Sequence, residues 1–230
     1  MAGPFEHLYE EQTPGLYAFS SLVVPRPKDW PEWIHVTGYW FLQPSQNWEP
    51  PDGLMEFLDA GSPPVYIGFG SMTNRKPEEG VEIALEALQE SGQRGILLRG
   101  WGGMSPDDLP KNVFLLDSIP HTWLFPRMSA VVHHGGAGTT GAGLRSGVPS
   151  IVVPHFADQP YWGERVQKLG VGPAPIARWR LTAGSLAKAI RRAVEDTGMR
   201  ERAAKLGAAI RAETGAQNAV DIILKNLKQN

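Results

Sequence analysis

Residues 130–165 read AVVHHGGAGTTGAGLRSGVPSIVVPHFADQPYWGER, and this stretch decides the fold of the chain. A short apolar run leads into two histidines and then a glycine-rich turn at 135–138, where glycine lets the backbone turn tightly and approach a ligand closely. Thr139 and Thr140 are predicted to open a helix whose free N–H groups and positive dipole end face the turn. Such a helix start is an anion site that suits phosphate.

A second loop follows the next apolar run, 150–153, and carries Asp158 and Gln159. In an open α/β sheet, ligands bind at the edge where the carboxyl ends of the parallel strands meet. Both loops are therefore predicted to share that edge. A carboxylate and an amide, which can hydrogen-bond hydroxyl groups, would then lie beside a phosphate cradle. This combination indicates a nucleotide-sugar site.

Composition excludes several other classes of protein. Lys and Arg number 22 against 24 Asp and Glu in 230 residues, and the net charge of -2 gives no general attraction to nucleic acid or acidic membranes. The chain has no cysteine, which excludes disulfides and thiolate metal sites. No apolar run approaches the roughly 20 residues of a membrane span, and the acidic start of the chain lacks the apolar core of a signal peptide. We therefore expect a globular, cytoplasmic protein.

The chain changes character near residue 64. Residues 1–64 are rich in proline and tryptophan and are predicted to be mostly an extended connector with one strand at 17–24; a long loop packed on a core is the alternative. Beyond it, short apolar runs alternate with helical patterns, which predicts an α/β fold with a Rossmann-like parallel sheet flanked by helices. The predicted strands lie at 65–69, 95–98, 113–116, 130–133 and 150–153, and the later helices at 138–146, 160–169, 184–197, 199–213 and 216–228.

These motifs closely resemble the donor-binding, C-terminal domain of GT-B glycosyltransferases that use UDP-sugars. The match is best to the branch containing sterol glucosyltransferases and bacterial enzymes that glycosylate lipids and natural products. The resemblance runs from about Trp33 to the C-terminus. It implies the C-terminal half of a GT-B fold, with a connector at 1–45, a nucleotide-sugar-binding domain at 46–215, and a helix at 216–230 that packs toward an N-terminal domain. The resembling stretches are VYIGFGSM at 65–72, IPHTWLFP at 119–126, HHGGAGTT at 133–140, GVPSIVVPHFADQPYWGERV at 147–166 and LGVGPAP at 169–175.

The glycine turn and helix start carry the diphosphate contacts in this interpretation. His134 can donate a ring N–H beside the helix start, and the corresponding histidine of the family contacts the diphosphate. Donors already aimed at the departing diphosphate lower the barrier to sugar transfer, and His134 and Thr139 are the candidates for that role. His133 points to the other face and is predicted to be structural. The predicted contacts are Ser71, His134, Gly136, Gly138, Thr139 and Thr140.

The sugar and base contacts also follow from the resemblance. Asp158 and Gln159 correspond to the pair that grips the 3- and 4-hydroxyl groups of the donor hexose, and Gln159 favours glucose. Main-chain atoms near Ile119 and His121 correspond to those that touch uracil. Trp101, in a glycine-rich loop, either stacks on the base or covers the core.

Two positions depart from the plant members of the family. Ser118 stands roughly where they place a tryptophan that stacks on uracil, and Ala142 stands where they place a glutamate for the ribose hydroxyls. No Asp-x-Asp pattern that would hold a metal-diphosphate complex occurs, so no metal is expected. The ribose and base contacts are therefore the least specified part of the predicted site.

The function expected is donor binding in an inverting, metal-independent hexosyltransferase that uses a UDP-sugar, with UDP-glucose favoured. The acceptor would be sterol-like or otherwise lipophilic, which would add peripheral membrane contact. In the family the catalytic base and acceptor pocket belong to the N-terminal domain, supplied in cis or in trans. This chain is expected to lack that domain and to bind the donor without transferring sugar. The face left exposed would offer a surface for dimerisation.

Two other interpretations stay open. An NAD-type Rossmann domain is suggested by Gly136, Gly138 and Gly141, which fit G-x-G-x-x-G. It is disfavoured because other strands precede this one and because Asp158 lies well past its strand. A non-catalytic nucleotide-binding module that keeps the fold is the second alternative, since fold does not fix function.

Overall fold

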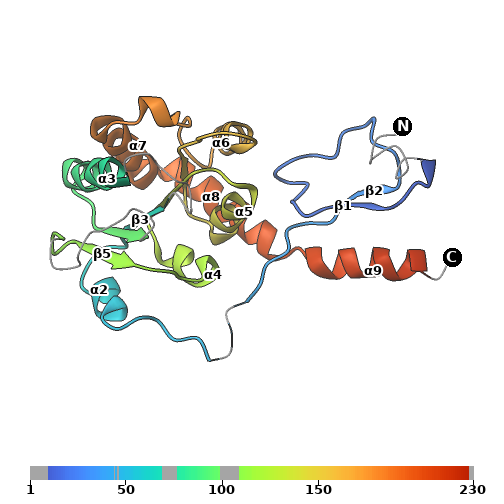
Figure 1. The fold of residues 1–230 in the computed structure, drawn as a ribbon, viewed down its shortest axis with the longest axis horizontal. Helices are drawn as coiled ribbons and strands as arrows, with labels where there is room; N and C mark the ends of the chain where they lie inside the picture. The colour runs from blue at the N-terminus through green and yellow to red at the C-terminus, as the bar shows by residue number, and fades with distance from the viewer. Residues whose placement is uncertain (1–9, 44, 46, 69–76, 99–108, 228–230) are drawn as a thin grey trace. The chain divides into compact units, whose positions relative to one another are not determined.

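Figure 1 shows a computed structural model that describes residues 10–43, 45, 47–68, 77–98 and 109–227. The predicted contacts at Ser71 and Trp101 lie outside these residues. The chain divides into two compact units, one of residues 43–208 and one of residues 1–42 with 209–230. Among the described residues, no helix combines the length and the apolar character that crossing a bilayer requires.

The larger unit is built on a five-stranded parallel sheet with the order β5-β4-β3-β6-β7. Its strands are short, mostly buried apolar runs, as expected for a parallel sheet covered on both faces. Strands β4 and β5 follow β3 in sequence and lie on one side of it. Strand β6, which comes next, lies on the other side of β3. The topological switch point, where such sheets bind ligands, therefore lies between β3 and β6. The strands are β3 (Val65–Gly68), β4 (Gly95–Leu98), β5 (Val113–Leu116), β6 (Ala130–His133) and β7 (Ser150–Val152).

One face of the sheet is covered by α3 (Pro77–Ser91) and α7 (Ala183–Glu195), which pack against each other (Figure 1). Alternate strand residues such as Val65 and Ile67 meet the apolar stripes of these helices in one buried core. The start of α7 is fixed by a capping box, in which Thr182 and Ser185 satisfy each other's backbone N–H.

The other face carries α4 (His121–Leu124), the 3-10 helix η2 (Phe125–Arg127) and α5 (Ala137–Ser146). Tyr66 of β3 packs on Phe125 with ring centroids 4.9 Å apart. Helix α5 approaches β6 and β7 closely at Gly143, where a Cβ would lie 2.7 Å from Ser150 Oγ. The remaining elements of this unit are α2 (Leu54–Asp59), α6 (Gln159–Lys168) and the 3-10 helix η3 (Arg178–Arg180), and α8 (Thr197–Arg211) runs past residue 208.

The smaller unit pairs β1 (Gly15–Tyr17) in parallel with β2 (Ile34–Val36) and includes α9 (Gly215–Leu227). The strand predicted at 17–24 is wrong, because the chain leaves the strand after Tyr17 and turns at Ser20. The Ser20 carbonyl accepts the N–H groups of Val23 and Val24, and its hydroxyl accepts that of Leu22. A serine that bonds its own local backbone competes with the strand ladder.

The remaining predicted elements agree with the structure. All five predicted strands of the large sheet are confirmed, and the five later helices begin and end within two residues of their predicted limits. The expected Rossmann-like parallel sheet is confirmed with them.

The buried contact between α7 and the sheet gives a first prediction. Leu186 of α7 is fully buried, so Leu186→Ala should lower the free energy of unfolding by about 2–5 kcal/mol in urea denaturation. Lys188→Ala on the same helix changes an exposed side chain and should shift the free energy of unfolding by no more than about 0.5 kcal/mol. Equal effects of the two substitutions would show that α7 is not anchored to this face.

Candidate functional site

The candidate site lies at the C-terminal edge of β6, beside the switch point. After β6 ends at His133, the chain turns through Gly135 with φ at 91° and enters α5 at Ala137. A Cβ on Gly135 would lie 2.6 Å from Val152 Cγ1 and 3.0 Å from the carbonyl oxygen of Gln159. Only glycine fits both the conformation and the space. The turn is therefore packed against β7 and against the start of α6.

The start of α5 presents unpaired backbone N–H groups. Gly136 is the N-cap, and the N–H of Thr140 donates to its carbonyl at 2.8 Å. The N–H groups of Ala137, Gly138 and Thr139 precede that bond and have no intrahelical partner. Among the described residues, a Cβ on Gly138 would meet nothing within 4 Å, so the space beside this residue is open. This end of the helix favours an anion.

The structure does not support the predicted phosphate contact of Thr140. Its N–H is used by the Gly136 carbonyl, and its side chain is fully buried. The helix begins at Ala137 rather than at the threonines, so Thr140 is already in the second turn and cannot face the ligand. Thr139, one position earlier, is half-buried and stays at the helix start.

His134 and His121 approach the site as neutral rings. His134 lies against the turn, where a Cβ on Gly136 would come within 2.5 Å of its Nε2. Burial lowers the pKa of His134, and the Asp158 carboxylate acts in the opposite direction. Burial also lowers the pKa of His121, and His134 adds to this effect. Near pH 7 each ring therefore offers one N–H donor and one acceptor.

His133 is fully buried behind the turn, as its predicted structural role requires. Its Nδ1 accepts the N–H of Gly135 at 3.1 Å. Burial lowers the pKa of this ring to about 3, so it is neutral at physiological pH.

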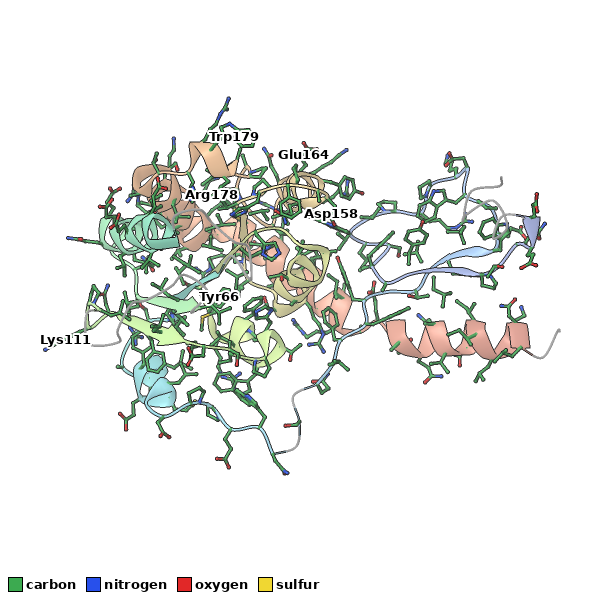
Figure 2. The ribbon with its side chains drawn as sticks, in the orientation of Figure 1. Tyr66, Lys111, Asp158, Glu164, Arg178 and Trp179 are labelled. Atoms are coloured by element: carbon green, nitrogen blue, oxygen red, sulfur yellow. The ribbon has the colours of Figure 1, made fainter. Side chains whose placement is uncertain are left out.

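Asp158 and Gln159 stand together at the start of α6, and their side chains do different things. Asp158, labelled in Figure 2, is exposed. Its Oδ2 accepts the Nε1–H of Trp162 at 2.7 Å. Gln159 is 5% exposed, and its Oε1 accepts the N–H groups of His155 and Phe156 at 2.7 and 3.2 Å. Gln159 therefore closes the loop before α6, whereas the Asp158 carboxylate reaches solvent. Sequence reasoning missed the Trp162 contact, for which the only signal is a spacing of four residues on a helix.

The loop before α4 carries the predicted base contacts. His121 turns its ring inward, stacked on Phe125 at 4.3 Å and with Nε2 3.4 Å from the Tyr66 hydroxyl. Its side chain thus covers the sheet. Only the main chain of His121 is left to make the predicted contact with uracil. Within the described parts of the chain, no backbone hydrogen bond uses Ile119.

The structure thus brings together a helix N-terminus, a neutral histidine and a carboxylate. His134 and Asp158 are close enough for the charge of one to affect the pKa of the other. Gly135 holds the turn directly against the Gln159 backbone. The arrangement can bind an anion at the turn and hydroxyl groups at Asp158. Among the described residues, no cluster of three acidic or histidine side chains could hold a metal ion.

Sequence comparison identifies related proteins. Residues 103–226 match the family model described as the Erythromycin biosynthesis protein CIII-like, C-terminal domain. The sterol 3-beta-glucosyltransferase UGT80A2 of Arabidopsis thaliana is 48% identical over 218 residues, which cover 93% of this chain and 34% of that protein. A sterol 3-beta-glucosyltransferase of Cryptococcus neoformans var. neoformans serotype D is 42% identical over 251 residues, covering 99% of this chain and 16% of that protein. The chain spans about a third or less of the length of these relatives.

Solved structures share the fold. The glycosyltransferase of kitacinnamycin superposes with a TM-score of 0.74 at 26% identity, covering 91% of this chain and 54% of that one. CalG4, the calicheamicin glycosyltransferase, superposes with a TM-score of 0.76 at 24% identity, covering 99% of this chain and 56% of that one. The expected fold, the C-terminal half of a GT-B fold, is confirmed.

The buried neutral ring of His133 predicts that stability falls in mildly acidic solution. Its pKa is about 3 in the folded protein and about 6.5 when exposed, so the unfolded chain binds the proton first as pH falls. The stabilisation is complete above pH 6.5 and is lost progressively down to about pH 3. From pH 7 to pH 5 this residue should remove about 2 kcal/mol from the free energy of unfolding. Urea denaturation at pH 7, 6 and 5 should show a weaker pH dependence in His133→Asn, and parallel curves would contradict it.

Proposed function

This chain belongs to the Erythromycin biosynthesis protein CIII-like C-terminal domain family, and from that premise we propose that it is the donor-binding half of an inverting UDP-sugar glycosyltransferase. UDP-glucose is the proposed donor, and a sterol-like or other lipophilic alcohol the proposed acceptor. The relatives named sterol 3-beta-glucosyltransferases support both choices. The observation that carries the proposal is the contact of Gly135 with Gln159, which sets an anion site beside the Asp158 carboxylate.

In this proposal the diphosphate binds at the start of α5. The N–H groups of Ala137, Gly138 and Thr139 and one ring N–H of His134 donate to its oxygens. As the bond between the sugar and UDP breaks, negative charge grows on the departing phosphate. Donors that already face this position stabilise the charge without reorganising. The helix end and His134 supply this stabilisation in the proposal, and no metal takes part.

The sugar is held at the start of α6. A carboxylate can accept hydrogen bonds from two neighbouring hydroxyl groups, and Asp158 is exposed at this point. Trp162 occupies one lone pair of Oδ2 and fixes the orientation of the carboxylate. Gln159 contributes by holding the loop at 155–156 in place.

The chemical step is a direct displacement at the anomeric carbon. The acceptor oxygen attacks from the face opposite UDP, the bond from carbon to the UDP oxygen breaks, and the acceptor proton passes to a base. We assign the base and the acceptor pocket to an N-terminal domain of the kind that the longer relatives have room for, in cis or in trans. This chain alone then binds the donor and transfers no sugar.

Calorimetric titration with UDP, UDP-glucose and NAD in EDTA tests the proposal. We expect saturable binding of UDP and UDP-glucose at roughly micromolar to millimolar affinity, and none of NAD. His134→Ala should weaken both ligands about 10-fold or more, because each loses a hydrogen bond to a charged group. Asp158→Ala should weaken the binding of UDP-glucose by a similar factor but leave the affinity for UDP unchanged.

The matched control is Glu164→Gln, which removes an exposed carboxylate from the same helix as Asp158 (Figure 2). It should leave both affinities unchanged. Binding of NAD alone would support a dinucleotide site instead, and dependence on added metal would refute the metal-independent mechanism. Sugar transfer by the isolated chain would show that the base lies within it.

The contact between Trp162 and Asp158 gives a separate prediction. Trp162→Phe keeps a buried aromatic ring but removes the hydrogen bond to Oδ2. We expect UDP-glucose to bind about 3- to 10-fold more weakly while UDP is unaffected. Trp179→Phe makes the same exchange at a side chain that is 79% exposed, and it should change neither affinity. Equal weakening of UDP and UDP-glucose in Trp162→Phe would mean that the ring supports the fold rather than the sugar contact.

A further inference from the structure

His133 makes a hydrogen bond that determines which of its ring nitrogens carries the proton. Nδ1 accepts the N–H of Gly135 at 3.1 Å, so Nδ1 itself bears no hydrogen. A neutral imidazole has one N–H, and here it must be on Nε2. The ring therefore presents an acceptor to the glycine turn and a donor to the interior of the protein.

The donor side of the ring lies in the same region as a second buried polar atom that has no partner among the described residues. Nε2 of His133 and Oγ of Ser150 are both buried, and neither has a partner among the residues the structure describes. Both atoms flank the same point on α5: a Cβ on Gly143 would lie 3.7 Å from Nε2 and 2.7 Å from Oγ. Buried polar groups are rarely left unpaired, and a hydroxyl can rotate to accept.

The acceptor side of the ring reaches the ligand site. Gly135 is the residue whose backbone packs on Val152 of β7 and on Gln159 at the start of α6. An acceptor that fixes the direction of the Gly135 N–H also fixes the peptide plane between His134 and Gly135. That plane belongs to the turn that packs against Gln159, the residue next to Asp158.

We propose that His133 is a positioning residue for donor binding: one buried water links its Nε2–H to Ser150 Oγ, and so holds Nδ1 as the acceptor that orients the Gly135 turn. This inference rests on the proposed function, since the turn is taken as the diphosphate site. Burial keeps the ring neutral above about pH 3, so the arrangement persists at physiological pH.

This role differs from simple packing in what can replace the histidine. An asparagine places its Oδ1 near the position of Nδ1 and can still accept from the Gly135 N–H. A leucine fills similar volume but accepts nothing. If the ring served only to fill the core, leucine would be the better replacement, because burying an amide is less favourable than burying a hydrocarbon.

The first experiment measures the tautomer in the wild-type protein, with no ligand present. Two-bond proton–nitrogen NMR correlations distinguish Nε2–H from Nδ1–H, and His133→Asn identifies the signal among the six histidines. We expect the Nε2–H form in the wild type and a measurable population of the other form in Ser150→Ala. A wild-type ring protonated on Nδ1 would overturn the proposal without any binding measurement.

The second experiment compares donor affinity in His133→Asn and His133→Leu, each shown to be folded by circular dichroism and urea denaturation. We expect His133→Asn to bind UDP-glucose within about 3-fold of wild type, and His133→Leu to bind at least about 10-fold more weakly. Leucine binding as well as wild type, or both variants losing affinity equally, would overturn the positioning role. Failure of the wild type to bind UDP or UDP-glucose would instead refute the proposed function, and the NMR result would stand separately.

Discussion

The close approach of the Gly135 backbone to β7 and α6 is the constraint on which the rest of the site depends. A side chain at this position would collide with Val152 and with the Gln159 carbonyl, and φ lies in the region that favours glycine. Because the backbone can come this close, the end of β6, the start of α5 and the start of α6 meet at one point. The helix amides, His134 and Asp158 all take their positions from that meeting.

Among the described residues, the proposed anion site has no buried positive charge. Burial lowers the pKa of His121, His133 and His134, so all three rings are neutral near pH 7. We propose that the attraction for an anion comes instead from oriented N–H groups, which need no counter-ion and cost little to bury once they are hydrogen-bonded. A neutral His134 also does not compete with a ligand for the Asp158 carboxylate. The two halves of the site can therefore lie side by side without forming an ion pair that would close it.

The features that could be predicted from the sequence are those that depend on residues close together along the chain. The strands were predictable because parallel strands covered on both faces are continuous apolar runs. The glycine turn was predictable because glycines cluster directly after a strand, and Gly135 stands where the backbone has a positive φ. Contacts across space were not predictable in the same way. The inward turn of Gln159, the Trp162 bond to Asp158 and the burial of Thr140 each depend on where a helix begins and which of its sides meets the sheet. The false strand at 17–24 has a local cause, since Ser20 captures the backbone that the strand would have used.

All described residues assigned to the donor lie within one unit of the chain, residues 43–208. They come from the start of α4 and the loop before it, from the turn after β6, and from the starts of α5 and α6. Stabilisation of a leaving group requires only that these elements hold their donors in place, so it can be complete inside a single unit. Activation of an acceptor requires a base on the opposite face of the sugar, and our proposal assigns that base to an N-terminal domain. In the proposed displacement, attack by the acceptor and departure of UDP occur in one step, and the residues of this chain that we assign to the donor are those suited to stabilising the departing UDP.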